Sequence, residues 1–179
     1  MTLTEKIIQV AKSYVGQKEK ANNSGFISSI VEAKMKLMGW LKGQAWCAYG
    51  AELIWHEAFK EFDPAGFPLV GKYFSGSAVQ TYYNFKKSPE FAVRLEPKAG
   101  SVIIWRHGSG MLGHAGICIE VVDVNTIKVV EGNTNASGGR EGIEWAIKTR
   151  KINQPFTEKG LNYLGSVYPV RINAEKKAA

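Results

Sequence analysis

The chain has 179 residues, of which 45% are hydrophobic and 11% aromatic. This size and composition fit one globular domain spanning residues 1–179, with a core over about 5–172 and a disordered C-terminal tail, and they argue against a fully disordered chain. The net charge of +7 favours polyanionic partners. The basic residues form no long run and no nucleic-acid-binding motif is present, so we expect no nucleic-acid partner.

No stretch approaches the roughly 20 apolar residues of a membrane-spanning helix. The N-terminal segment alternates apolar and polar residues and lacks the apolar centre of a signal peptide, so we expect synthesis in the cytoplasm without an export signal. Two cysteines are too few for a disulfide framework. Three histidines without zinc-type spacing give no reason to expect a metal or another cofactor. We expect a monomer.

The first half of the chain predicts helices. Apolar residues recur at helical spacing over 7–15 and stop at Gly16. Ser24 is a candidate cap for a second helix with an apolar stripe over 26–38. A third helix is predicted over about 46–59, with one apolar face that includes Cys47.

Two further segments precede the second half of the chain. Residues 60–73 contain two prolines and two glycines and predict a loop. A short fourth helix is predicted over 77–85.

After Pro97 the pattern changes to short β-branched or aromatic runs, most of them separated by Gly, Asn, Asp or Pro. Five such runs predict an antiparallel sheet of about five strands. Asp123 and Asn125 favour a tight hairpin between two of the strands. Helices followed by a sheet predict an α+β fold, with N-terminal helices packed on a C-terminal antiparallel sheet.

Cys47 lies in the sequence GQAWCAYGAELIW, residues 43–55. A cysteine on an apolar helix face is usually a small core residue. Cys47, however, falls in the first turn of the predicted helix, where unpaired backbone N–H groups and the helix dipole favour a thiolate. Cys47 is therefore a candidate nucleophile.

His114 begins a strand in which Ala115 and Ile117 belong to the apolar positions, so its side chain points to the opposite face. A single histidine in such a place is more often structural. Of the other histidines, His107 is predicted in an exposed loop and His56 on a solvated helix face.

Glu131 and Asn133 end the next predicted strand, and their spacing of two puts them on one side. Turn chemistry explains Asn133, but explains Glu131 less well because Val129 and Val130 precede it. An oxygen of either side chain could accept the Nδ1–H of His114 across the hairpin. A thiol, an imidazole and such an acceptor form a nucleophile–base–orienter array.

These segments resemble a known family. GQAWCAYGAELIW is similar to the cysteine motif of the CHAP domain, the cysteine, histidine-dependent amidohydrolase/peptidase family with a papain-like (NlpC/P60-related) fold. GSVIIWRHGSGMLGHAGICIEVV is similar to its histidine motif, and IKVVEGNTNASGGREGIEWAIKTRKI to its third motif and its continuation. The resemblance runs from about residue 10 to residue 171. It implies Cys47 as nucleophile, His114 as base, and Glu131 with Asn133 completing the site.

The resemblance also implies a substrate. Such domains cleave amide bonds in peptidoglycan, often as phage endolysins or bacterial autolysins, so we expect an N-acetylmuramoyl-L-alanine amidase or an endopeptidase acting through a cysteine thioester. The basic charge would attract anionic wall or outer-membrane polymers, and the enzyme would reach the cell wall after release or delivery. The alternatives are a papain-like acyl transferase or transglutaminase-like enzyme, and a non-catalytic wall-binding module.

Two further expectations concern the cleft. Some CHAP enzymes bind calcium through an acidic stretch before the cysteine, but no acid stands between Glu32 and Cys47 here, so we expect no such site. We expect side chains near the cleft to bind substrate, with Gln44 also a candidate oxyanion donor; these candidates are Gln44, Trp46, Tyr49, Trp105 and Arg140, with Tyr73 and Trp145 as further rim residues. For the aromatic rim residues and Arg140, packing in the core or on the surface is the alternative.

Overall fold

The computed structural model describes residues 1–134 and 142–171, and of Arg171 only the backbone. The predicted C-terminal tail lies outside the described residues. The helical elements come first: α1 Leu3–Tyr14, the 3₁₀ turn η1 Ala21–Asn23, α2 Ser29–Leu37, α3 Cys47–Phe62, α4 Phe67–Tyr73 and α5 Ala78–Lys86. The strands follow: β1 Phe91–Arg94, β2 Val102–His107, β3 Gly113–Asp123, β4 Thr126–Thr134, β5 Glu144–Lys151 and β6 Leu161–Arg171. The predicted α+β plan is confirmed.

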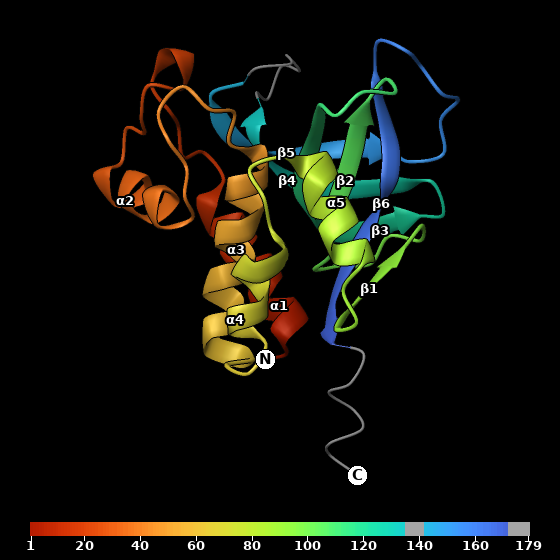
Figure 1. Ribbon diagram of the computed structural model, residues 1–179, viewed down its shortest axis with the longest axis horizontal. Helices are drawn as coiled ribbons and strands as arrows, with labels where there is room; N and C mark the ends of the chain where they lie inside the picture. Colours follow the sequence, from red (N-terminus) through yellow and green to blue (C-terminus); the bar gives the residue numbers. More distant parts are fainter. Residues whose placement is uncertain (135–141, 172–179) are drawn as a thin grey trace.

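The described strands form one antiparallel sheet in the order β1-β6-β2-β3-β4-β5. Figure 1 shows α1 to α4 gathered beside the sheet, with α5 lying across the sheet. Strands β2 to β5 follow one another in sequence and pair in sequence order. The predicted hairpin joins β3 to β4, with Asp123 opposite Thr126. Neighbouring strands therefore carry His114 and Glu131.

Both faces of the sheet are covered where it approaches the helices. Along β2 and β3, residues such as Ile104 and Ile117 belong to the main core, which the helices share. The alternate positions point to the other face, because side chains alternate along a strand. That face has a smaller apolar cluster, formed by Ile103, Trp105, Cys118, Ile127 and Val129. His114 has the same parity as Cys118, so it faces this second cluster, as predicted.

Helix α3 is the centre of the helical layer and packs against α1, α4, β3 and β4. Its predicted apolar face is confirmed, because Ala51, Ile54, Trp55, Ala58 and Phe59 are all buried. An aromatic group fixes the start of the helix: the ring centroid of Trp46 lies 4.2 Å from that of Trp145 and 5.1 Å from that of Phe26. The first turn of α3 is thereby held beside β4 and β5.

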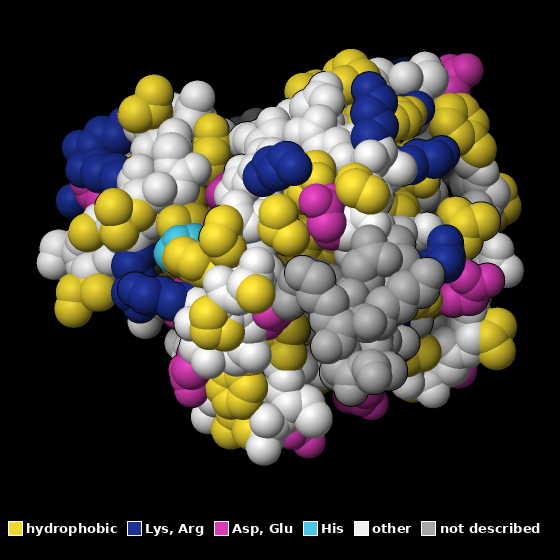
Figure 2. All heavy atoms as spheres, turned by 60° about the horizontal axis from the view of Figure 1, so that its bottom comes forward, with side chains coloured by type: hydrophobic (Ala, Val, Ile, Leu, Met, Phe, Trp, Pro, Cys, Tyr) yellow, Lys and Arg dark blue, Asp and Glu magenta, His cyan; other side chains and the backbone are white. Residues whose placement is uncertain are grey.

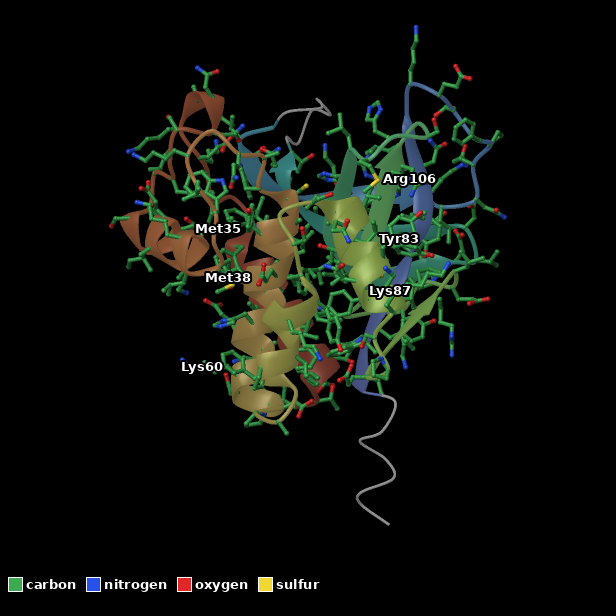
Figure 3. The ribbon with its side chains drawn as sticks, viewed as in Figure 1. Met35, Met38, Lys60, Tyr83, Lys87 and Arg106 are labelled. Atoms are coloured by element: carbon green, nitrogen blue, oxygen red, sulfur yellow. The ribbon has the colours of Figure 1, made fainter. Side chains whose placement is uncertain are left out.

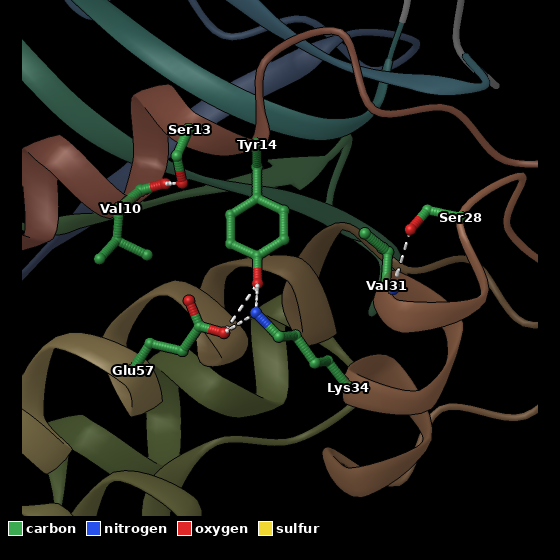
Figure 4. A network of polar contacts seen from close by, with 7 residues as sticks. All are labelled: Val10, Ser13, Tyr14, Ser28, Val31, Lys34 and Glu57. Atoms are coloured by element: carbon green, nitrogen blue, oxygen red, sulfur yellow. Dashed lines mark hydrogen bonds and ion pairs between the residues drawn. The ribbon is translucent and has the colours of Figure 1, made fainter.

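A polar network ties α1, α2 and α3 together (Figure 4). The Tyr14 hydroxyl of α1 donates to Glu57 Oε1 of α3 at 2.9 Å. Lys34 Nζ of α2 lies 2.6 Å from the same carboxylate oxygen and donates to the Tyr14 hydroxyl at 3.3 Å. These contacts orient α2 on the helical layer without a large buried area.

A contact between side chains of α5 and β2 fixes α5 on the sheet. Tyr83 and Arg106 point toward each other in Figure 3, and the Arg106 guanidinium donates to the Tyr83 hydroxyl and lies over its ring. In the described residues, no helix combines the length and the apolar character that crossing a membrane requires.

Two local predictions are wrong, and the sheet has one strand more than the predicted five or so. Ser28, rather than Ser24, caps α2, and Ile27 and Ile30 of the expected stripe are exposed. The expected loop over 60–73 contains α4, because a proline is favourable in the first turn of a helix. The sheet has a sixth strand, β1, which pairs with β6 at the sheet edge.

Candidate active site

Cys47 is the first residue of α3 and is 7% exposed. The cap position, Trp46, makes no side-chain hydrogen bond to the helix end. The first backbone N–H groups of a helix have no acceptor within the helix, and the helix dipole adds positive potential there. The local sequence therefore places a thiol where a negative charge is stabilised.

The Cys47 thiol lies within hydrogen-bonding contact of His114. Burial alone would raise the pKa of the thiol, but the charge and hydrogen bond of His114, together with the backbone N–H groups of Ala115 and Ala48, lower it below its ordinary value. Burial would likewise lower the pKa of His114, but Cys47 and Glu131 raise it to about 10. The two groups therefore favour a thiolate–imidazolium pair.

Glu131 contacts the other side of the His114 ring. His114 Nε2 lies 2.9 Å from Glu131 Oε2. The expected contact between these residues is present, but it involves Nε2 rather than Nδ1, so Nδ1 is the nitrogen left to face the thiol. Gly116 stands opposite Glu131 in the sheet, and a Cβ at this position would lie 2.8 Å from Glu131 Cγ. The glycine therefore leaves the room that the carboxylate needs.

Arg150 of β5 contacts the same carboxylate. Its Nε donates to Glu131 Oε1 at 2.7 Å and its Nη2 to Glu131 Oε2 at 2.6 Å. Burial would raise the pKa of Glu131, which is fully buried, but the hydrogen bonds and charges of Arg150 and His114 lower it to about 2. Glu131 is therefore an anion at neutral pH.

A cavity of about 280 Å³ opens onto this array. Cys47 and His114 form part of its wall, so the thiol can meet a ligand that enters. Its lining combines apolar side chains with a few polar groups, as is usual for ligand sites; the lining residues are Ala45, Cys47, His107, Leu112, Gly113, His114, Asn133, Thr134, Arg150 and Leu161.

A family model described as the CHAP domain matches residues 39–133, just over half of the chain. The match includes Cys47 and His114, which line the cavity, and the buried Glu131, which contacts His114. The chain belongs to the CHAP-domain family. Membership indicates a hydrolase of the amidase or peptidase type that acts on peptidoglycan. No curated protein and no solved structure matches the chain.

Asn133 lies at the cavity wall of this CHAP domain rather than against His114. Its backbone has a φ of +55°, and the register of β4 with β5 shifts between Glu131 and Thr134. The alternation that would put Glu131 and Asn133 on one side is therefore interrupted. With the amide nitrogen of Asn23 turned toward its acceptors, Asn23 donates to Asn133 Oδ1 at 3.2 Å.

Of the other predicted substrate-binding residues of the CHAP domain, those within the described part of the chain do not line the cavity. Trp46 is fully buried, and its Nε1 donates to Glu19 at 2.6 Å. Trp105 is buried in the second apolar cluster, with its ring 5.9 Å from that of His114. Both belong to the core because their ring faces are covered by other side chains.

The remaining rim candidates that the structure describes are also absent from the cavity lining. The Tyr49 hydroxyl donates to Gln44 Oε1, which also accepts the N–H of Leu41. Gln44 Oε1 therefore stabilises a turn, and the role of its Nε2 group as an oxyanion donor stays a prediction. Tyr73 and Trp145 are buried, and Arg140 lies outside the described residues.

Two residues of the CHAP-domain site were missed by sequence reasoning. His107 ends β2 and lines the cavity, although the sequence predicted an exposed loop residue there. The sequence feature that indicates a cavity position for His107 is its place at the end of an apolar strand. Arg150 lies in a run that predicts a strand, and the sequence gives no indication of its pairing with Glu131 beyond their opposite charges.

Proposed function

We propose that this CHAP domain cleaves an amide bond of peptidoglycan, either the N-acetylmuramoyl-L-alanine amide or a peptide bond of the wall peptide, through a thioester on Cys47. The observation that carries the proposal is the Cys47–His114–Glu131 array, in which Cys47 and His114 line the cavity and the buried Glu131 contacts His114. A thiol at a helix start, an imidazole and an ionised orienting carboxylate are the groups that covalent acyl transfer needs.

The first half of the reaction forms the thioester. The Cys47 thiolate attacks the carbonyl carbon of the substrate amide, forming a carbon–sulfur bond. The His114 imidazolium gives its proton to the amine nitrogen as the carbon–nitrogen bond breaks, so the amine leaves neutral. Backbone N–H groups in the first turn of α3 are positioned to stabilise the oxygen anion that develops.

The second half releases the acid. His114 is now neutral and takes a proton from a water molecule, whose oxygen attacks the thioester carbon. The carbon–sulfur bond breaks, the thiolate leaves, and the imidazolium is restored. Glu131 stabilises the imidazolium in both halves because its ionised carboxylate accepts from Nε2.

The route to the wall is part of the proposal. We propose that the protein is made in the cytoplasm and acts after release or delivery, and that its positive charge attracts anionic wall or outer-membrane polymers. On the face shown in Figure 2, lysine and arginine side chains stand in several separate groups. Such an arrangement supports diffuse attraction to a polymer rather than a single binding groove.

The test is digestion of purified peptidoglycan followed by mass spectrometry of the soluble products. We expect new amino and carboxyl termini at one type of amide bond, with clearing of the suspension, and the masses identify the bond. An added amine that replaces water in the product would indicate an acyl transferase instead. Intact peptidoglycan after incubation with folded protein would contradict the proposal.

A further inference from the structure

Arg150 is held at the active site by more contacts than a surface ion pair requires. Its two hydrogen bonds to Glu131, of 2.6 and 2.7 Å, use both carboxylate oxygens. Its guanidinium also lies over the Trp105 ring, at 5.8 Å from the centroid. Trp105 stands opposite His114 in the sheet, and the two rings are 5.9 Å apart. One indole thus supports both partners of the carboxylate.

The arginine and the histidine share one buried carboxylate oxygen. Glu131 Oε2 receives Nη2 of Arg150 and Nε2 of His114, while Oε1 receives Nε of Arg150. The Glu131 side chain is fully buried, whereas that of Arg150 is 32% exposed and reaches the cavity. A bidentate pair fixes the plane of a carboxylate, so Arg150 also fixes the direction from which His114 is held.

The charges of the four residues balance. Glu131 and Arg150 cancel, so the Cys47 thiolate and the His114 imidazolium form a neutral pair in a site with no net charge. If Arg150 were neutral, the same ion pair would leave one uncompensated negative charge in a buried place, which is costly. Addition of a proton to Cys47 would restore neutrality.

We propose that Arg150 is a positioning residue that fixes Glu131 against His114 and balances its charge, so that Cys47 is held as a thiolate. This inference rests on the proposed function for its catalytic meaning. Two other titratable groups face the array: His107 of β2 lines the cavity, and Glu19 bonds to Trp46 next to Cys47. The charged partner of the Cys47 thiol is His114, which Glu131 and Arg150 hold from its other side.

The test measures thiol reactivity rather than lysis. The rate of Cys47 alkylation by iodoacetamide is followed against pH, with mass spectrometry to locate the label. In Arg150→Gln we expect the midpoint of thiolate formation to rise by about one pH unit or more. Arg150→Lys keeps the positive charge but loses the bidentate pair of hydrogen bonds to Glu131. Because the charge is retained, we expect its midpoint of thiolate formation to lie near that of the wild type. The control is Arg106→Gln, which removes a similar arginine stacked on Tyr83 outside the cavity.

A paired variant separates charge balance from simple loss of packing. Glu131→Gln leaves an excess positive charge, so we expect His114 to lose its proton at lower pH. Removing both charges in Glu131→Gln/Arg150→Gln restores neutrality, and the Cys47 midpoint should return to within about half a pH unit of the wild type. If Arg150→Gln alone does not fold, the comparison of Glu131→Gln with the double variant decides the matter: the unpaired Arg150 charge in Glu131→Gln should lower the Cys47 midpoint below that of the double variant, and equal midpoints would overturn the inference.

An unchanged midpoint in folded Arg150→Gln would overturn the inference. So would a double variant whose midpoint is raised as far as that of the single variant, or an Arg150→Lys midpoint raised equally far. Because alkylation needs no peptidoglycan, the expected shifts in a protein that leaves peptidoglycan intact would contradict the proposed function and leave the inference standing.

Discussion

The two cysteines of this CHAP domain are almost equally buried, yet their thiols differ in acidity. Cys47 starts α3 and faces His114 and two backbone N–H groups, which lower its pKa despite burial. Cys118 lies in the middle of β3 among apolar side chains, where burial raises its pKa to about 11. Its thiol donates to the carbonyl oxygen of Glu120, at 3.6 Å.

Two glutamates repeat the contrast. Glu131 is fully buried, but Arg150 and His114 lower its pKa to about 2. Glu52 of α3 is also buried, and burial raises its pKa to about 8. Burial alone thus favours the neutral form, and the hydrogen-bonding partners decide which buried group carries charge.

The largest expected effect is at the cysteines. Cys47→Ala should reduce peptidoglycan cleavage by about 10³-fold or more, because no other group can form the thioester. Cys118→Ala should retain activity and lose about 1 kcal/mol of unfolding free energy, since it removes only a small packed side chain. Clearing rates and denaturant unfolding check both variants. Equal loss of activity in the two variants would remove the distinction between the cysteines.

A smaller effect is expected at the orienting residue. Glu131→Gln should lower kcat by roughly 10²-fold, because an amide does not stabilise the imidazolium as a carboxylate does. Asn133→Ala should cost less, since its side chain lies at the cavity wall. Steady-state kinetics on both variants decide between them. A larger loss at Asn133 would exchange the two roles.

The contrast between the glutamates predicts a change in stability. The folded protein keeps a proton on Glu52 up to about pH 8, whereas the unfolded chain releases it near 4.5. The folded state therefore binds more protons between these values, and the contribution of Glu52 to stability falls as pH rises through this window. Glu52→Gln should raise the unfolding free energy at pH 8 by on the order of 1 kcal/mol.

Denaturant unfolding at pH 5 and pH 8 measures this effect, and the gain should be much smaller at pH 5. Glu131 should show the opposite dependence. Its folded-state pKa of about 2 lies below the ordinary 4.5, so its contribution is complete above 4.5 and is lost as pH falls toward 2. A variant at position 52 that is no more stable at pH 8 than the wild type would show that Glu52 is solvated there.

The smallest expected effect is that of chelation. Among the described residues, no three His, Cys, Asp or Glu side chains group as metal ligands would. Treatment with EDTA should therefore leave the rate of peptidoglycan cleavage unchanged. A loss of activity that calcium restores would show that a metal contributes to the site.

Much of the fold could be predicted because local signals agreed with the tertiary structure. The apolar face of α3 and the alternation along β3 placed Cys47 and His114 on elements that meet, and the hairpin made Glu131 a neighbour. α4 was missed because Pro68 suggested a loop, although its position in the first turn of the helix is compatible with a helix. β1 was missed because four residues, Phe91–Arg94, carry too little pattern.

The site could be predicted only where contacts follow from adjacent strands. Arg150 stands opposite Ile127 in the register, four residues from Glu131 along β4, so strand pairing alone does not bring them together. The long arginine side chain spans that distance. The interrupted alternation at Asn133 likewise depends on a backbone conformation with positive φ, which the residue type permits but does not require.

His114, Glu131 and Arg150 come from three successive strands, whereas Cys47 comes from the helical part that the ribosome makes first. While only that part has been synthesised, the imidazole that lowers the pKa of the thiol does not yet exist in the chain. The thiol then has the ordinary acidity of a free cysteine, for which little thiolate forms at neutral pH. The lowered pKa of the nucleophile is therefore acquired only once β3 has been made and His114 has reached Cys47.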